Sequence, residues 1–379
     1  MVGTTLPTPM YALYADHMHF ALFTTTVIFA TYAVGVLGAL LLFGRWSDAI
    51  GRRPVLLAGA AFALASAVVF LFADDIALLL VARLLSGLSA GIFTGTATAA
   101  VVEAAPPAQR DRAAVVATIA NIGGLGAGPV LAGLLVEYAP HPLQLSFVVH
   151  IVLVVLAVGA VLLAPETSSR TGRLGVQRLS VPAEMRPVFI TAATAAFAGF
   201  AVTGLFTAVV PSFVSQVIGI DNHAIAGAAA GSIFAASAIA QLSARRMPPA
   251  RAVAIGCAIL VAGMVILAAA LHFSSLTGLI VAAVVAGVGQ GISFSRGLAA
   301  IAERAPADRR AEVSSTYFVV AYVAIALPVV GEGLAAQHWG LRTAGVSFAI
   351  AIGVLSAICL AMILVQESRR RPAAESVHI

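Results

Sequence analysis

Two long uncharged runs, separated by a short arginine-rich turn, constrain the fold of this chain more than any other feature. Phe20 to Gly44 contains no charged residue, and neither does Pro54 to Ala73. Each run is long enough to cross the hydrocarbon core of a bilayer as a helix, which takes about 20 residues. Because the backbone polar groups in lipid must be satisfied within the segment, such runs predict spanning helices. The sequence therefore predicts a helical hairpin in a membrane.

The composition extends this prediction to the whole chain. Hydrophobic residues make up 61% of 379 and charged residues 10%, with a mean hydropathy of +1.03, whereas a soluble domain carries about a quarter charged residues. The sequence has neither a phosphate-binding glycine loop with a lysine nor a nucleophile motif or metal-ligand cluster. We therefore expect an all-α membrane protein that is not an enzyme and uses no cofactor or metal.

The positions of the basic residues predict the topology. All 21 are arginine, and 18 of them fall in alternate loops and the C-terminal tail. Such asymmetry follows the positive-inside rule, which makes the arginine-rich side cytoplasmic. We expect a multi-pass protein of the cytoplasmic (inner) membrane with a cytoplasmic C-terminus. The same distribution explains the positive net charge without a nucleic-acid partner.

The spans form two related halves. Glu103-Ala104-Ala105-Pro106 in the first half aligns with Glu303-Arg304-Ala305-Pro306 in the second, and Pro129 aligns with Pro328. Repeated halves around a midplane site are typical of secondary transporters. The predicted organisation is a first helical half (1–164), a cytoplasmic linker (165–186), a second helical half (187–365) and a cytoplasmic tail (366–379). The predicted spans lie at about 20–44, 54–73, 76–103, 113–137, 143–164, 187–215, 222–244, 251–272, 276–303, 312–336 and 343–365.

The repeat also predicts a twelfth span at the start of the chain. Pro211 in the second half aligns with Pro7, but 25 residues lead from Arg186 to Pro211 and only six precede Pro7. We expect twelve spans in two six-helix halves, with the first span truncated at its N-terminus. The alternative is a short first helix.

The arginine-rich turn resembles the signature of the helix 2–3 loop in the major facilitator superfamily. The matching residues are Gly44, Asp48, Gly51, Arg52 and Arg53. The resemblance implies the major facilitator fold and a conformational latch, in which the carboxylate meets the positive end of a helix in the other half.

Glu103, at the end of its span, is the expected partner of Arg52. The alternative is that these arginines only set the topology.

A second pattern resembles the helix 5 signature of the drug:proton antiporter branch of that family. It comprises Gly124, Gly128, Pro129 and Gly133. Small residues at this spacing allow close helix contact, and a proline removes one helical hydrogen bond. The pattern predicts a helix-packing role and favours efflux over uptake.

Several polar or aromatic residues within spans are candidates for transport. Charges there are costly and usually face a cavity or a partner. The proton-coupling candidates are Arg83, in a segment that resembles the helix 4 motif of the family, and Glu332. Their alternatives are an arginine satisfied by backbone carbonyls and a carboxylate wetted at the outer mouth. The substrate-cavity candidates are Arg296, for an anionic group or as a counter-charge, with Asn121, Tyr32, Gln290 and Phe294; Gln241 is a further uncharged polar group in a span.

The implied function is secondary active transport by alternating access. We expect proton-coupled efflux of a small amphipathic molecule by a monomer, driven by the proton gradient across the bilayer. The alternatives are a proton-coupled uptake symporter for a sugar or organic acid, and a non-transporting membrane sensor on the same fold.

Overall fold

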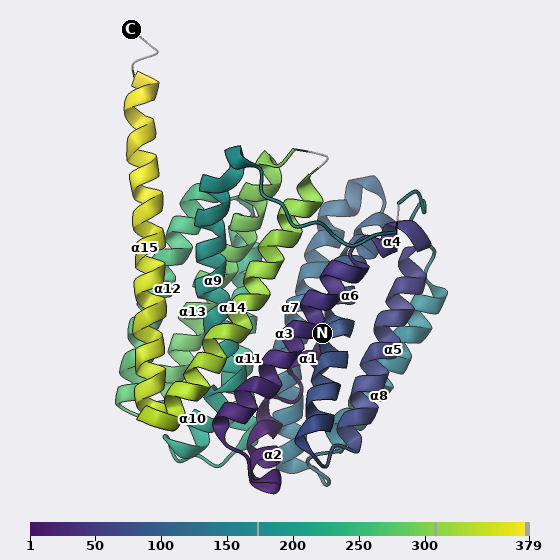
Figure 1. The fold of residues 1–379 in the computed structure, drawn as a ribbon, viewed down its shortest axis with the longest axis vertical. Coiled ribbons are helices and arrows are strands. Elements are labelled where there is room, and N and C mark those ends of the chain that lie inside the picture. The colour runs from purple at the N-terminus through teal and green to yellow at the C-terminus, as the bar shows by residue number, and fades with distance from the viewer. Residues whose placement is uncertain (173, 307–308, 376–379) are drawn as a thin grey trace.

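The computed structural model describes residues 1–172, 174–306 and 309–375, and its regular elements within these ranges are all helices (Figure 1). The first half contains α1 (Val2–Thr5), η1 (Thr8–Met10), α2 (Tyr11–Met18), α3 (Leu22–Phe43), α4 (Trp46–Ile50), α5 (Arg52–Leu71), α6 (Ile76–Ala104), η2 (Pro107–Gln109), α7 (Arg110–Tyr138) and α8 (Leu145–Leu163). The second half contains η3 (Ala183–Met185), α9 (Arg186–Ala208), α10 (Val210–Gln216), α11 (His223–Ser243), η4 (Ala244–Arg246), α12 (Pro249–His272), α13 (Leu276–Arg304), α14 (Arg310–Trp339) and α15 (Leu341–Glu375).

The described part of the chain contains 11 helices that are long and apolar enough to cross a membrane. They correspond to the eleven complete spans predicted from the sequence, and the all-α membrane fold is confirmed. Most ends differ by a few residues, but the span predicted at 187–215 is divided into α9, which ends at Ala208, and α10. α15 continues as a helix through Glu375, beyond the predicted end of the last span. The segment predicted as a truncated first span forms the short helices α1, η1 and α2, in which Leu6, Met10 and Tyr14 are buried.

The two halves lie side by side, α1–α8 in one group and α9–α15 in the other (Figure 1). They meet mainly where α7 packs on α11 and where α3 packs on α14. One end of the bundle carries α4, the segment between α8 and η3, and the end of α15; we call it the arginine-rich face, and the other end the opposite face. α15 rises above the rest of the bundle at the arginine-rich face (Figure 1).

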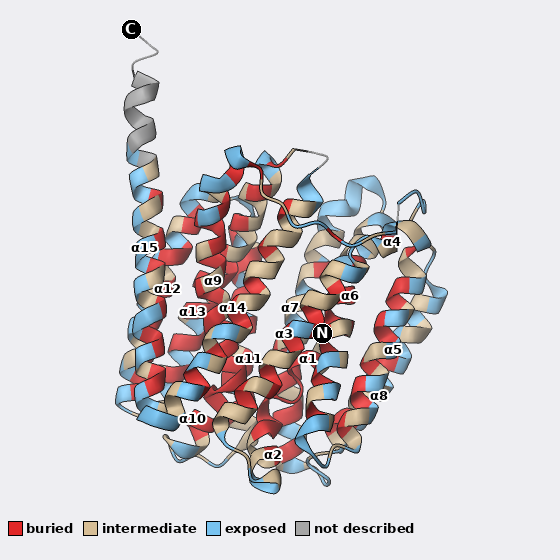
Figure 2. Ribbon diagram, viewed as in Figure 1, coloured by how far each residue is buried: buried red, intermediate tan, exposed pale blue. Residues whose placement is uncertain are grey.

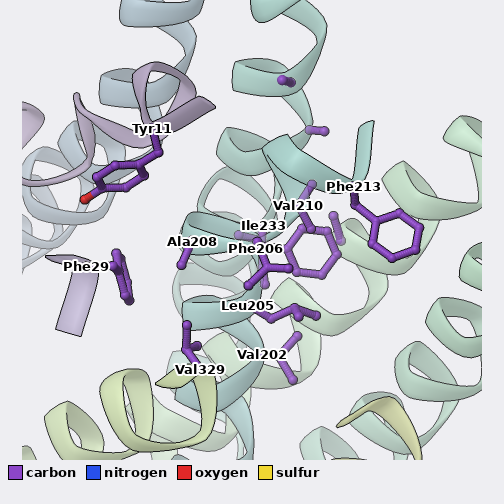
Figure 3. Close-up of a cluster of buried hydrophobic side chains, with 14 of the residues drawn as sticks. Tyr11, Phe29, Val202, Leu205, Phe206, Ala208, Val210, Phe213, Ile233 and Val329 are labelled. Carbon is purple, nitrogen blue, oxygen red and sulfur yellow. The ribbon is translucent and has the colours of Figure 1, made fainter. Parts of the chain in front are cut away.

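The largest hydrophobic core joins the two halves. Buried residues concentrate where helices face one another, and exposed ones on the outer surfaces of the bundle (Figure 2). In this core, Tyr11 and Phe29 of the first half lie on one side, and Ala208 and Val329 of the second half on the other (Figure 3). Lipid tails are as apolar as these side chains, so close van der Waals packing, and not removal from water, holds the two halves together at this core.

Local sequence explains where several helices begin. Asp75, Asn222 and Ser275 each accept a hydrogen bond from the backbone N–H three residues later, which caps α6, α11 and α13. Such side chains satisfy N–H groups that lack a helical partner. At the arginine-rich face, Gly51 has φ +115° between α4 and α5, a backbone conformation that favours glycine.

The segment between the halves crosses the arginine-rich face (Figure 1). It is fixed to the first half by hydrogen bonds from the N–H of Gly172 to the carbonyl of Asp48 and from the N–H of Gln177 to the carbonyl of Leu41. At its far end, the N–H of Ser180 donates to Oγ1 of Thr316 on α14. This connection therefore touches both halves.

Candidate functional site

A cavity of about 330 Å³ lies between the two halves. Three substrate candidates from the sequence, Asn121, Gln290 and Phe294, line it. The other lining residues are Thr94, Thr98, Ala117, Thr118, Ile122, Leu125, Phe200, Thr203, Ile233, Phe234, Ser237, Gln241, Ser295, Leu298, Phe318 and Tyr322. They come from α6 and α7 of the first half and from α9, α11, α13 and α14 of the second. We call this space the central cavity.

Aromatic rings form much of one wall of the central cavity. The Phe294 ring lies 4.9 Å from Phe200 and 5.9 Å from Phe318 between centroids, both edge to face, and it stacks on Tyr317 at 5.6 Å and 10°. These geometries suit aromatic pairs. The sequence analysis missed Phe200 and Phe318, because a phenylalanine in an apolar helix gives the same signal whether it faces lipid or a cavity.

A chain of polar side chains crosses the wall formed by α11 and α13. Nε2 of Gln241 donates to Oγ of Ser237 over 3.2 Å, and that hydroxyl donates to Oε1 of Gln290 over 2.6 Å. This chain orders the two amides and leaves the amide nitrogen of Gln290 as a donor. The cavity thus combines apolar surface with a few fixed polar groups, as small-molecule sites do.

A smaller space of about 250 Å³ adjoins the central cavity toward the arginine-rich face. Arg245 and Arg296 line it, and Thr118, Gln241 and Ser295 line both spaces. We call it the arginine chamber. Arg296, a substrate candidate from the sequence, therefore borders this chamber and not the central cavity itself.

Tyr32 lies beside the central cavity but outside its lining. Its ring contacts that of Tyr322 edge to face, with centroids 6.4 Å apart. Tyr32 belongs to α3 and Tyr322 to α14, so this pair joins the halves next to the cavity.

Arg83 is 1% exposed and lies behind this tyrosine pair. Its guanidinium donates to the carbonyls of Thr4 over 2.7 Å and Phe29 over 3.5 Å. The ring centroids of Tyr32 and Phe29 are 4.9 and 5.5 Å from the guanidinium carbon. Carbonyl oxygens and aromatic faces thus surround this charge. This environment agrees with the alternative interpretation, in which backbone carbonyls satisfy Arg83.

Glu332, the other proton-coupling candidate, lies in the second half and away from the central cavity. It is 4% exposed, and within the described part of the chain neither carboxylate oxygen has a hydrogen-bond partner. Its neighbours near Gly345 include Leu271 and Phe213. An ionised carboxylate in such surroundings would be uncompensated and costly. The environment therefore differs from a wetted outer mouth.

The residues of the predicted latch form a compact network on the arginine-rich face. Nη2 of Arg52 lies 2.8 Å from Oε1 of Glu103, and Nη1 lies 2.7 Å from Oδ1 of Asp48. Nη1 also donates to Oγ of Ser47. Arg52 thus ties the start of α5 to the end of α6. These contacts lie within the first half and the segment between the halves. The resemblance had implied instead that Asp48 meets a helix of the second half.

The sequence analysis missed Glu166, which completes the network. Its carboxylate accepts from the backbone N–H groups of Arg52 over 2.8 Å and Arg53 over 3.1 Å, at the start of α5. Partial burial opposes ionisation, but hydrogen bonds from the N–H groups of Ser168, Arg52 and Arg53, with the charge of Arg170, hold the pKa of Glu166 below its usual range. A Cβ on Gly51 would collide with this carboxylate. Gly44 ends α3 just before the network.

Close helix contacts lie between the central cavity and the opposite face. A Cβ on Gly128 would collide with Thr5 and the carbonyl of Val2, one on Gly124 would crowd Met1, and one on Gly133 would collide with the carbonyl of His223. The predicted packing motif therefore faces α1 with two glycines and α11 with a third.

From the other side of this contact, a Cβ on Gly227 of α11 would collide with the carbonyl of Pro129. The seal between α7 and α11 thus depends on backbones that nearly touch, which small residues permit. Beyond it, a separate cavity of about 620 Å³ lies at the opposite face, lined by residues of both halves that include Asp16, Thr25 and Asp221.

Comparison with known proteins agrees with this architecture. A solved D-xylose-proton symporter superposes with a TM-score of 0.75, covering 95% of this chain and 93% of that one at 14% identity, which shows the shared fold. The chain is 35% identical over 129 residues to the tetracycline resistance protein, class D, of Salmonella ordonez, and 29% identical over 105 residues to the arabinose-proton symporter of Bacillus subtilis (strain 168). These segments cover 34% and 28% of this chain, and 31% and 23% of the two relatives.

The family comparison covers more of the chain than the alignment with either relative does. The profile of the Major Facilitator Superfamily matches residues 1–327, which include all of the first half and most of the second. The two relatives belong to different functional branches, one of resistance and one of symport. The chain therefore belongs to the Major Facilitator Superfamily, a family of transporters and not of enzymes, and its described part is that of a multi-pass membrane protein.

Proposed function

We propose that the protein exports small amphipathic molecules in exchange for protons by alternating access. The observation that carries this proposal is the asymmetry of the interface between the halves. The central cavity adjoins the arginine chamber on one side, while α7 and α11 close it on the other. By the positive-inside rule we assign the arginine-rich face to the cytoplasm, and this asymmetry then supports loading of the solute from the cytoplasm.

Two observations favour export. The Gly124–Gly133 motif resembles the signature of the drug:proton antiporter branch, and the more similar of the two relatives is a tetracycline resistance protein. The cavity lining, which combines aromatic rings with neutral hydroxyl and amide groups, suits an amphipathic solute.

Proton-coupled sugar uptake is the second candidate, because the other relative is an arabinose-proton symporter. The hydroxyl and amide groups of the central cavity would also suit a polyol.

Proton coupling requires a group that gains and loses a proton during the cycle, and Glu332 is our candidate. It is a buried carboxyl without a hydrogen-bond partner among the described residues. Arg83, whose guanidinium keeps its proton, is our candidate for a positioning residue in coupling, because it contacts Tyr32, which in turn contacts the cavity residue Tyr322.

Inverted membrane vesicles with a pH-sensitive dye test the direction. After acidification of the lumen, an exporter releases protons when an amphipathic compound is added outside and accumulates that compound inside. A symporter would instead co-transport protons with arabinose or xylose. A sensor would produce neither flux. In that case Asp48→Ala and Arg83→Ala would leave the background dye signal unchanged.

A further inference from the structure

We propose that the central cavity and the arginine chamber together select planar aromatic anions. Such a molecule has a flat conjugated ring system and one carboxylate or similarly acidic oxygen group. This inference rests on the proposed transport function, but not on its direction. Three features of the adjoining spaces carry it: a fixed aromatic wall, a neutral polar lining and an excess of positive charge at one end.

The aromatic wall is held in place from behind. Tyr317 is buried, stacks on Phe294, and donates from its hydroxyl to the backbone carbonyl of Phe294 over 3.1 Å. Phe200 and Phe318 contact the same ring edge to face. Because these rings already hold each other in favourable pairs, a flat solute adds to them without costly rearrangement. A saturated ring of the same size loses the pairing between π-systems.

The polar groups of the central cavity are neutral. Its described lining contains hydroxyls and amides and no charged side chain. The hydrogen bond that Oε1 of Gln290 accepts from Ser237 leaves the Gln290 amide nitrogen as a donor. Asn121 lines the same space, and among the described residues no hydrogen bond occupies its side chain. This lining suits oxygen substituents on the ring system, but it offers no counter-charge to the body of the solute.

The arginine chamber supplies that counter-charge at one end. Nη1 of Arg296 donates to the carbonyl of Arg245 over 3.0 Å, and its Nη2 is 4.0 Å from a carboxylate oxygen of Glu303, whose side chain is 62% exposed. Arg245 donates to the carbonyl of Asp111 over 3.4 Å. Two guanidinium groups thus line the chamber, and among the described residues the one carboxylate paired with either of them is the exposed Glu303 at 4.0 Å from Arg296, which leaves net positive charge in the chamber.

One solute can reach both spaces. Thr118, Gln241 and Ser295 line the central cavity and the arginine chamber alike. A molecule whose ring lies against Phe294 can therefore direct an acidic group past these shared residues toward Arg296 in the chamber. The planar guanidinium group matches a carboxylate in two parallel hydrogen bonds.

Binding to the purified full-length protein in nanodiscs tests this selectivity without any need for flux. Isothermal titration would compare 2-naphthoate with three probes of similar size: 2-naphthylmethanol, which is neutral, 2-naphthylmethylammonium, which is cationic, and trans-decalin-2-carboxylate, which is anionic but saturated. We expect 2-naphthoate to bind about tenfold more tightly than the neutral and cationic probes, the size of effect given by one charge-assisted hydrogen bond. It should bind about fivefold more tightly than the decalin acid, the size of effect given by one aromatic pair.

Two pairs of variants assign the preference to the proposed groups. Arg296→Gln should abolish the preference over 2-naphthylmethanol, whereas Arg251→Gln, at an exposed arginine outside both spaces, should keep it. Phe294→Leu should abolish the preference over the decalin acid, whereas Phe72→Leu, at a ring 74% exposed beyond α5, should keep it. Thermal unfolding identifies any variant that does not fold, and Arg296→Lys, which keeps the charge, should retain part of the preference.

The outcomes separate this inference from the proposed function. Equal or tighter binding of the neutral or cationic probe overturns the inference, as does a preference that survives Arg296→Gln in folded protein. Selective binding of 2-naphthoate without proton-driven movement in vesicles contradicts the proposed transport but upholds the site. Proton-driven movement of other compounds, with no preference for 2-naphthoate, contradicts the inference alone.

Discussion

Oε2 of Glu137, at the end of α7, accepts a 2.8 Å hydrogen bond from the backbone N–H of His223, the first residue of α11. Nδ1 of the His223 ring lies 3.3 Å from the same oxygen. A carboxylate at a helix N-terminus is favourable because the free N–H groups carry partial positive charge. Since α7 and α11 belong to different halves, this contact joins the halves at the opposite face. It must break if the cavity is to open on that side.

Removal of this contact should favour opening at the opposite face. We expect Glu137→Ala to increase the labelling rate of a cysteine placed at Thr203, a residue of the central cavity, by about tenfold, because a hydrogen bond to a charged group contributes ~1.5–3 kcal/mol. The measurement uses intact cells and a membrane-impermeant maleimide, after replacement of Cys257 and Cys359 by alanine. Glu137→Gln keeps an acceptor oxygen and should lie between the two. Equal rates in all three proteins would contradict a gating role for the contact.

The backbone contact between α7 and α11 predicts a glycine that tolerates no side chain. Gly227→Ala places a methyl group against the carbonyl of Pro129, so the seal should form poorly. We expect transport to fall by about tenfold, the effect of ~1.4 kcal/mol on the closed state. Gly123→Ala, on α7, meets open space and serves as the control. Similar transport by both variants would show that this close approach is unimportant.

The network on the arginine-rich face predicts that two neighbouring arginines differ. The Arg52 side chain bonds Glu103 and Asp48, whereas Arg53 is fixed through its backbone N–H. We expect Arg52→Gln to lower transport by about tenfold or more, because it leaves two carboxylates without their partner, and Arg53→Gln to change it less than about threefold. Substrate accumulation in vesicles, normalised to protein amount, measures both. A larger loss of transport from Arg53→Gln would indicate that these arginines act by setting the topology and not through the network.

The burial of the Glu332 carboxyl predicts that one substitution can remove proton coupling without loss of stability. Glu332→Gln preserves the shape and removes the ionisable group, so we expect a melting temperature at or above that of the unmodified protein, because a desolvated carboxyl costs free energy. If Glu332 carries the proton, accumulation driven by a pH gradient should be lost while gradient-independent exchange of substrate continues. Glu312→Gln, near the start of the same helix, is the control. Undiminished accumulation would remove Glu332 as the coupling group.

The sequence predicted the spans well because lipid imposes a strong one-dimensional rule. Each segment must be apolar over a bilayer-spanning length, and arginines collect at one set of turns. The observed helices α3 and α5 accordingly lie within a few residues of the uncharged runs at 20–44 and 54–73. Residues 2–18, where the repeat predicted a truncated span, form the short helices α1, η1 and α2, whose positions depend on tertiary contacts: α1 packs on α6 and α7, and η1 on α7 and α11.

In the candidate site, the sequence singled out some residues and missed others. Asn121 and Gln290 could be singled out from the sequence because a polar side chain in an apolar span lines a cavity or bridges helices, although the sequence did not separate these two roles. Phe200, Phe318 and Tyr322 were not, because aromatic residues suit lipid, core and cavity equally. Glu166 was missed because its role depends on the folded position of the start of α5, far from it in the sequence.

The sequence by itself determined that this chain is a bundle of membrane helices with a charged face, and its turn motif pointed to the major facilitator superfamily. Only the tertiary structure decided which polar groups meet: that Arg83 is surrounded by carbonyls and aromatic rings, that Glu332 lies apart from the cavity, and that Arg296 borders a chamber beside it. The physical reason is that hydropathy reports the transfer of each segment into lipid, whereas the rotation of each helix about its axis is set by packing against its neighbours.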